Sequence, residues 1–378
     1  MCVMTNKIKL TLALIIVFLP FLLFQGCDPI VTEFPPVSDA VNYQAGEVVD
    51  VPGKDTLLVM TWNIRFGIGR MAWFGDACGE RVIATDDEIL TVMEALAAKI
   101  NELDPDIIFL QEADVESKRT GYLDQVQWLL DHTGLNYGAY ASMWEAQFVP
   151  SDGLGRINTG NAILSKWEIT DAERIQLPLR GDQDALTKMF YLRRNILKTR
   201  IALPGKDNFY AVDIHATAFA TDDTKKKHLD RFKEELDEIV SGGGVFLAGG
   251  DLNEIPPGAA KLDYCLEDMC EGESYHQPGD DPEHREGSYF LYFDDENTWL
   301  QGLYDTYYPA VAHSDYIADE TRYFTHTPDF DNLSTNAWDR KIDYLWASAP
   351  WVAGSDSTHQ EAVTPSDHCP VTAKWVVP

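Results

Sequence analysis

The chain has 378 residues, and 45% of them are hydrophobic, so it can bury a sizeable core in one large domain or in two smaller ones. Its 61 acidic residues outnumber 30 basic ones and give a formal net charge of −31. This balance argues against a broad basic face for nucleic acid, although a metal ion and a few local arginines could still hold a phosphate.

The N-terminus has the pattern of a bacterial export signal. Two lysines precede an apolar run over 10–24, which is short for a membrane span. Gly26 and Cys27 follow this run and resemble a lipoprotein cleavage site. We therefore expect 1–26 to be removed as a signal peptide, Cys27 to be lipidated, and the exported protein to be anchored to a membrane of the cell envelope. Ordinary signal-peptide cleavage near Cys27 is the alternative.

Residues 27–54 are rich in proline and show little periodicity, which predicts a tether. A single domain over 55–378 is then the simplest organisation, with an acidic insertion at 265–297. The cysteines of the domain are Cys78, Cys265, Cys270 and Cys369. Their pairing stays open, although Cys265 and Cys270 are close enough in sequence for a small local loop.

Apolar strands alternate with amphipathic helices along the domain. Apolar runs predict strands at 57–65, 107–110, 137–143, 160–165, 195–201, 209–215, 245–249, 341–346 and 371–377. Helical spacing of apolar residues predicts helices at 86–103, 122–131 and 225–240. Strands outnumber helices and few connections are long, so we expect an α/β fold in which two sheets pack face to face with helices outside.

Many of these strands end in polar side chains that a buried strand does not need. The residues are Asn63, Glu112, His215, Asp251 with Asn253, Asp343, and Asp367 with His368. Each of them alone could belong to a turn, a cap or a surface ion pair. Strand ends along one edge of packed sheets converge, however, so together they predict one polar site. There the carboxylate of Asp251 beside the amide of Asn253 suits a metal-activated water next to a phosphate.

Short blocks surround these polar residues. The blocks are Trp62-Asn63-Ile64-Arg65, Gln111-Glu112, Gly160-Asn161-Ala162-Ile163-Leu164-Ser165, Ile214-His215, Gly250-Asp251-Leu252-Asn253, Lys341-Ile342-Asp343-Tyr344 and Ser366-Asp367-His368. As an ordered set over 57–376 they resemble the endonuclease/exonuclease/phosphatase superfamily, which includes DNase I, abasic-site endonucleases, neutral sphingomyelinases and inositol polyphosphate 5-phosphatases. The resemblance implies a four-layer α/β sandwich of two mainly antiparallel sheets, and cleavage of a phosphoester that depends on Mg²⁺ or Mn²⁺.

The same resemblance implies roles for single residues. Glu112, with Asn63 and Asp367, would hold the metal ion, because Mg²⁺ prefers oxygen ligands and needs only one or two carboxylates. Asp251 would orient or deprotonate the attacking water, and Asn253 would hold that water and a phosphate oxygen. Such a site needs no nucleophilic serine or cysteine, because phosphoryl transfer relies mainly on positioning and charge stabilisation.

Two histidines would complete the site. His368, with its imidazole oriented by Asp343, would contact the phosphate and support the developing charge. His215 would be a second phosphate contact or a proton donor to the leaving group, and Asn161 would line the same pocket. Arg65 departs from the abasic-site endonucleases, which commonly carry an acid at its position.

The substrate stays open among nucleic acid, a nucleotide, a phospholipid head group and a sugar phosphate. The enzyme could thus be a nuclease or a sphingomyelinase-like phospholipid hydrolase. The acidic composition weighs against duplex DNA, and a lipid tether favours head groups or nucleotides. A non-catalytic surface-binding lipoprotein of the same fold is the competing function. We expect a monomer, and the insertion at 265–297 could be a substrate lid or a solvated loop.

Overall fold

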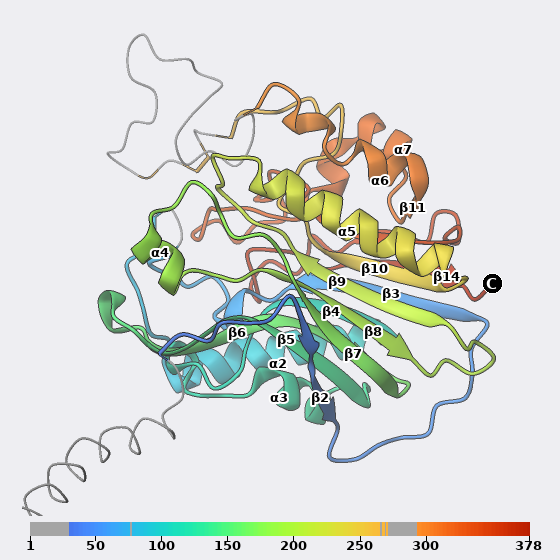
Figure 1. Cartoon of the computed structure of the whole chain (residues 1–378), viewed down its shortest axis with the longest axis horizontal. Helices are drawn as coiled ribbons and strands as arrows, with labels where there is room; N and C mark the ends of the chain where they lie inside the picture. Colours follow the sequence, from blue (N-terminus) through green and yellow to red (C-terminus); the bar gives the residue numbers. More distant parts are fainter. Residues whose placement is uncertain (1–29, 76–77, 265–266, 269, 271–292) are drawn as a thin grey trace, which may run out of the picture.

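Two seven-stranded sheets form the centre of the molecule (Figure 1). The structure, a computed structural model, describes residues 30–378 apart from 76–77, 265–266, 269 and 271–292. The strands of the first sheet are β2 (Val41–Gln44), β3 (Thr56–Asn63), β4 (Ile107–Asp114), β5 (Tyr137–Val149), β6 (Gly155–Ser165), β13 (Ser357–Thr358) and β14 (Val371–Val376). Those of the second sheet are β1 (Val37–Asp39), β7 (Ile169–Gln176), β8 (Asn195–Ile201), β9 (Phe209–His215), β10 (Val245–Asp251), β11 (Tyr308–Pro309) and β12 (Asp343–Ala347).

Each sheet contains one parallel pair among antiparallel neighbours. The first sheet has the order β13-β14-β3-β4-β6-β5-β2, with β3 and β4 parallel. The second has the order β1-β7-β8-β9-β10-β12-β11, with β9 and β10 parallel. The described α-helices are α2 (Asp86–Leu103), α3 (Gln125–His132), α4 (Ala185–Phe190), α5 (Thr224–Ser241), α6 (Gln301–Thr306) and α7 (His313–Ala318). The expected pair of mainly antiparallel sheets is confirmed.

Alternate residues of the central strands face different layers. In β3, Trp62 packs with the apolar faces of α2 and α3, while Val59 lies in the core between the sheets. In β10, Leu247 faces that same core and Phe246 packs against Phe232 of α5. Figure 1 shows α5 on one outer face and α2 with α3 on the opposite side. The layers are therefore helix, sheet, sheet and helix, and burial on both faces explains the almost continuous apolar strands.

A crossover helix joins the two strands of each parallel pair. β3, α2 and β4 make one such unit, and β9, α5 and β10 make the other. α2 begins at a capping box in which Thr85 and Glu88 each accept the other's backbone N–H. Both strands of a parallel pair end at the same edge, so the register sets the end residue Asp251 beside His215.

The longest helices match the sequence prediction most closely. The helix expected at 86–103 is confirmed over its full length, and the one expected at 225–240 is longer by one residue at each end. α3 starts later than the expected 122, because the side chain of Asp124 caps its first turn. The strand expected to end at residue 249 continues to Asp251, and neither β7 nor α4 was predicted.

The tether expected at 27–54 is wrong over 37–44. There β1 pairs with β7 at the edge of the second sheet, and β2 pairs with β5 at the edge of the first. Edge strands are held by backbone hydrogen bonds and need no apolar periodicity, so the sequence pattern did not reveal them. The signal peptide expected at 1–26 and Cys27 lie outside the described residues. Among the helices that the structure does describe, none has the length and apolar character needed to cross a membrane.

A disulfide joins Cys78 to Cys270. The local loop that Cys265 and Cys270 could have formed is therefore excluded. Cys369 is a buried free thiol at the start of the C-terminal strand region. Most of the insertion expected at 265–297 lies outside the described residues, so both of its proposed roles stay predictions.

Candidate active site

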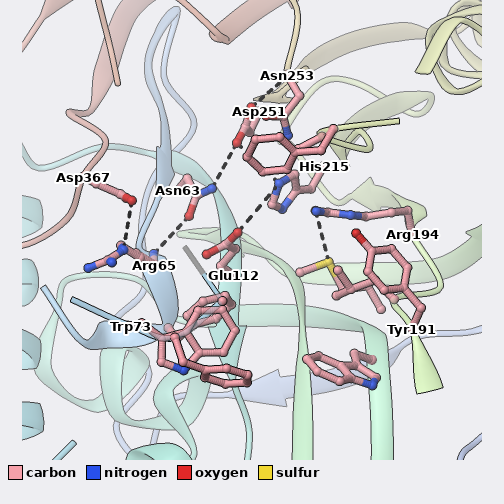
Figure 2. Close-up of a pocket in the computed structure, with 18 of the residues that line it drawn as sticks. Asn63, Arg65, Trp73, Glu112, Tyr191, Arg194, His215, Asp251, Asn253 and Asp367 are labelled. Carbon is pink, nitrogen blue, oxygen red and sulfur yellow. Dashed lines mark hydrogen bonds and ion pairs between the residues drawn. The ribbon is translucent and has the colours of Figure 1, made fainter. Parts of the chain in front are cut away.

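The polar strand ends meet at one edge of the sandwich. Asn63 ends β3 and Glu112 lies in β4, both in the first sheet. His215 and Asp251 end β9 and β10 in the second sheet. The side-chain amide of Asn63 donates a hydrogen bond to Oδ2 of Asp251 at 3.1 Å, which joins the two sheets at this edge (Figure 2). The folding of two separate crossover units therefore assembles one site.

Left-handed backbone orients two of the predicted site residues. Glu112 has a φ of 59° and lies where the pairing of β4 with β6 shifts register, which marks a β-bulge. Asn253 has a φ of 49°, two residues beyond the end of β10. Each such conformation costs about 1–3 kcal/mol outside glycine and persists only where the surrounding structure enforces it. The sheets thus hold both side chains in directions that a relaxed strand would not give.

Asp251 lies at the centre of the polar groups. Its Oδ1 accepts the backbone N–H of Asn253 at 2.9 Å, and its Oδ2 lies 3.4 Å from Nε2 of His215 and 3.8 Å from Nε2 of His368. Burial raises the pKa of Asp251 to about 7; the charge of His368 opposes this rise and that of Asp343 adds to it. A carboxyl group whose pKa lies near neutrality is matched to accepting a proton from water.

Asp343 fixes the imidazole of His368. Nδ1 of His368 lies 2.9 Å from Oδ2 of Asp343, and the carboxylate is fully buried. Burial lowers the pKa of His368, but the charges of Asp343, Asp251 and Asp367 outweigh it and raise the pKa to about 10. His368 is therefore an imidazolium at neutral pH, a form that binds anionic phosphate oxygens strongly.

His215 is electrostatically the opposite of His368. Burial lowers its pKa well below the usual value, and the nearby charge of Arg194 lowers it further. Its Nε2 lies 3.8 Å from Oε1 of Glu112. A neutral imidazole can donate an N–H to a phosphate oxygen but carries no extra proton at neutral pH. The site therefore favours His215 as a phosphate contact over His215 as the proton donor to the leaving group.

Glu112, Asp367 and Asn63 offer oxygen atoms that suit a divalent cation. Burial raises the pKa of Glu112 to about 7, and the charge of Asp367 adds to the rise. Oδ2 of Asp367 forms an ion pair with Nε of Arg65 at 2.9 Å, and Oδ1 of Asn63 accepts the Arg65 backbone N–H at 3.0 Å. A buried carboxylate that repels a second acid gains from a hard cation placed between them. The donor set therefore fits a hard divalent cation.

Groups of three potential ligand atoms also lie close together around His368. In the described part of the chain, such atoms fall within 4.8 Å of one another in the sets His326, Asp367, His368 and Asp251, Asp343, His368. Both sets need the imidazole that Asp343 already holds, and neither includes Glu112. We therefore regard them as parts of the phosphate-facing side of the site.

Asn161 does not line the pocket with the other predicted residues. It lies inside β6 and is fully buried. Its side-chain amide donates to the carbonyl oxygen of Asn195 at the start of β8, at 3.2 Å. Strand alternation places Asn161 on the same face as Ile163, which belongs to the core between the sheets. The predicted position of Asn161 is wrong, because its side chain bridges the two sheets.

Three pocket residues were not selected from the sequence as site residues. Arg65 pairs with Asp367, Arg194 lowers the pKa values of Glu112 and His215 through its charge, and the ring of His326 lies 4.6 Å from that of His368. Arg194 precedes β8, which is antiparallel to β9, so the start of β8 meets the end of β9. Arg194 could have been found by also looking for polar residues just before strands that pair antiparallel with a strand ending at the site.

All of the site residues described above except Asp343 and Asn161 line one pocket with a volume of about 590 Å³. Figure 2 shows Arg65 with Asp367 on one side of it, Arg194 with Tyr191 on the other, and Glu112 between them. The remaining lining is largely apolar and comes from loops, β5 and α4. The site therefore combines a charged end, rich in carboxylates and cations, with an apolar end.

Comparison with known proteins identifies the family. The model of the Endonuclease/Exonuclease/phosphatase family matches residues 60–368, and the chain belongs to this family. Its members are generally hydrolases that act on phosphoester bonds. No curated protein matches the chain in a sequence search.

Several solved structures resemble this one at low sequence identity. An endonuclease/exonuclease/phosphatase from Beutenbergia cavernae DSM 12333 is 18% identical with a TM-score of 0.50, over 85% of this chain and 71% of that chain. Truncated TDP2 from Caenorhabditis elegans is 16% identical with a TM-score of 0.47, over 85% and 98% of the two chains. The human Nocturnin catalytic domain with bound sulfate is 13% identical with a TM-score of 0.47, over 89% and 96%. The first of these similarities shows a shared four-layer α/β sandwich.

Proposed function

We propose that the protein is a hydrolase of phosphoesters that depends on Mg²⁺ or Mn²⁺ and uses water as the nucleophile. The observation that carries this proposal is the joining of Asp251 to Asn63, His215 and His368 at the meeting point of the two sheets. This arrangement supports hydrolysis because it places a proton acceptor (Asp251), an imidazolium (His368) and side-chain amides around a space large enough for a phosphate. The family's general activity on phosphoester bonds supports the same conclusion.

The chain's own groups divide the reaction between them. Asp251, oriented by Asn63 and by the backbone of Asn253, accepts the proton of the attacking water. His368, kept charged by Asp343, binds a phosphate oxygen on which negative charge increases as the new P–O bond forms. The old P–O bond breaks, and the leaving group departs as an alkoxide or phenolate that takes its proton from solvent water. In the same transition state, Asp251 thus removes a proton from the nucleophile and the imidazolium of His368 stabilises negative charge on the phosphate.

Glu112, Asp367 and Asn63 would hold the metal ion. When bound, a divalent ion neutralises phosphate charge and stabilises a leaving oxygen. Arg65 keeps Asp367 in place through their ion pair, and His215 contributes a neutral N–H beside Glu112. These residues orient the phosphoester at the charged end of the pocket.

The test is hydrolysis of bis-p-nitrophenyl phosphate by metal-free protein before and after Mg²⁺ or Mn²⁺ is added. We expect the rate to rise at least about tenfold with either ion and to fall again with excess chelator. Without a cation, the phosphate charge is not neutralised and the leaving oxygen is not stabilised. A non-catalytic binding module of the same fold would show no turnover under any of these conditions. Turnover that ignores the chelator would exclude the metal-dependent form of the proposal.

We also propose that the protein is exported and anchored by a lipid on Cys27, as a monomer. Support for export comes from the charged and apolar pattern of 1–26 and the Gly26-Cys27 pair. A single acyl anchor binds membranes only weakly, so a lipoprotein needs more than one chain for stable attachment. Mass spectrometry of the mature N-terminus decides this: an unmodified Cys27, or a chain that begins elsewhere, contradicts lipidation.

A further inference from the structure

The pocket extends past the charged groups into an apolar compartment that no catalytic role uses. Its walls include Trp73, Phe74, Trp144, Leu186, Phe190 and Tyr191. These residues come from three separate parts of the chain: the loop after β3, strand β5, and α4 with the residue that follows it. Figure 2 shows Trp73 below Arg65 and Glu112, and Tyr191 beside Arg194. The compartment therefore begins where the phosphate would be held.

One wall of the compartment is held rigidly by aromatic packing. The ring of Trp73 lies 5.1 Å from Phe66 and 4.9 Å from Phe74 between centroids. The guanidinium of Arg119 lies 3.4 Å from the centroid of Phe66 and 4.8 Å from that of Trp73, and a fully buried ion pair with Asp114 fixes it. Rings stabilised in this way lose little conformational freedom when a ligand stacks on them.

The opposite wall is formed by the short helix α4. Asp184 caps it by accepting the backbone N–H groups of Leu186 and Thr187. Leu186 is 69% exposed although it lines the pocket, so its side chain is not part of the core. Phe190 is half-buried, and both it and Trp144 pack against the same buried apolar cluster around Leu154. This wall presents apolar surface whose burial on binding would be favourable.

We propose that this compartment binds an apolar aromatic group attached to the scissile phosphate, so that the preferred substrates are aryl phosphoesters. The proposal rests on the proposed function, because the phosphate must lie at the charged end near Arg194 and His368. Aromatic rings favour aromatic partners over aliphatic chains of similar size. Among the six wall residues named above, the side-chain polar groups of Trp73 and Trp144 are indole N–H donors, so the N–H groups of a nucleobase would find few acceptors there.

The test uses calorimetry in the presence of Mg²⁺ to measure the equilibrium binding of ligands that share an anionic phosphorus group. The ligands are methylphosphonate, hexylphosphonate, phenylphosphonate and thymidine 5′-phosphate. We expect phenylphosphonate to bind at least about tenfold more tightly than methylphosphonate, from burial of the ring and its stacking. It should also bind more tightly than the hexyl and thymidine ligands. Tightest binding of hexylphosphonate would indicate an acyl site and of thymidine 5′-phosphate a nucleotide site, and either result overturns the proposal.

Variants locate the binding. Phe190→Ala should lower the ratio of phenyl to methyl affinity by about fivefold or more, because it removes one aromatic wall. Phe148→Ala removes the same side chain from β5 outside the pocket, where Phe148 is 58% exposed, and should leave the ratio unchanged. If Phe190→Ala does not fold, Leu186→Ser at an exposed position replaces it. Equal affinities for the phenyl and methyl ligands, or equal ratios in all variants, overturn the aromatic compartment.

This experiment separates the two proposals, because binding does not require turnover. Selective binding of phenylphosphonate without any hydrolysis of bis-p-nitrophenyl phosphate would remove the proposed function and keep an aryl-anion site. Metal-dependent hydrolysis without selective binding would keep the proposed function and remove the aromatic compartment.

Discussion

Replacing Asp251 by asparagine is expected to lower kcat for bis-p-nitrophenyl phosphate by about 10³. The substitution keeps the size of the side chain and can keep the contact with Asn63, but it removes the group that accepts the proton of water. General-base catalysis and preorganised electrostatics each contribute roughly 10² or more. Because Asp251 is 2% exposed and lies 3.4 Å from His215, no solvent-exposed group can take its place at that point. The measurement is kcat at saturating Mg²⁺.

Asp230→Asn is the matched control for Asp251→Asn. Asp230 is an exposed residue of α5 that pairs with Lys226, and its loss should leave kcat unchanged. Thermal unfolding of both variants should show that the folds are intact. A value of kcat for Asp251→Asn within threefold of the wild type would remove Asp251 from the reaction.

Asp343→Asn is expected to make the activity depend on pH in a new way. In the wild type the pKa of His368 is about 10, so the imidazolium is present throughout the neutral range. Without the charge of Asp343, burial prevails and the pKa of His368 falls toward or below its ordinary value of about 6.5. The His368 imidazolium then loses its proton above that pKa and regains it below that pKa. We expect kcat to fall by about 10² at pH 8 and to recover in part near pH 6.

The readout for Asp343→Asn is the ratio of its kcat to that of the wild type at each pH. Any pH dependence that the two proteins share, such as metal binding by Glu112, cancels in this ratio. A ratio that is low but constant from pH 6 to pH 8 would mean that Asp343 only supports the fold. A ratio near one at all pH values would mean that His368 needs no charge.

The sequence predicts the elements that are buried on both faces. β3, β4, β9 and β10 are almost continuously apolar because one face meets a helix layer and the other meets the second sheet. β7 was missed because Ile169–Gln176 mixes charged and apolar residues, and its pairing with β1 and β8 rather than its composition makes it a strand. The edge strands β1 and β2 were not predicted for the same reason: their pairing with neighbouring strands, and not their composition, makes them strands.

The polar end of the site was predictable because its residues end or follow apolar strands. Asp251 and His215 stand out where a core strand ceases to be apolar, and parallel pairing then brings them together. Asn161 was assigned to the pocket by the family resemblance alone, and its side chain lies on the face of β6 that points to the second sheet. Arg194 and the aromatic compartment could not be found in this way. Their side chains come from loops, strand β5 and a short helix, and these parts of the chain come together only in the finished fold.

The central claim is that a cation is bound at the meeting point of the two sheets and that hydrolysis depends on it. Titration of metal-free protein with Mn²⁺, followed by the paramagnetic resonance of the free ion, tests this claim most directly. We predict saturable binding to the wild type that is weakened about tenfold or more by Glu112→Gln, together with an equal rise in the Mn²⁺ needed for hydrolysis. Unchanged Mn²⁺ binding and unchanged hydrolysis in Glu112→Gln would contradict it.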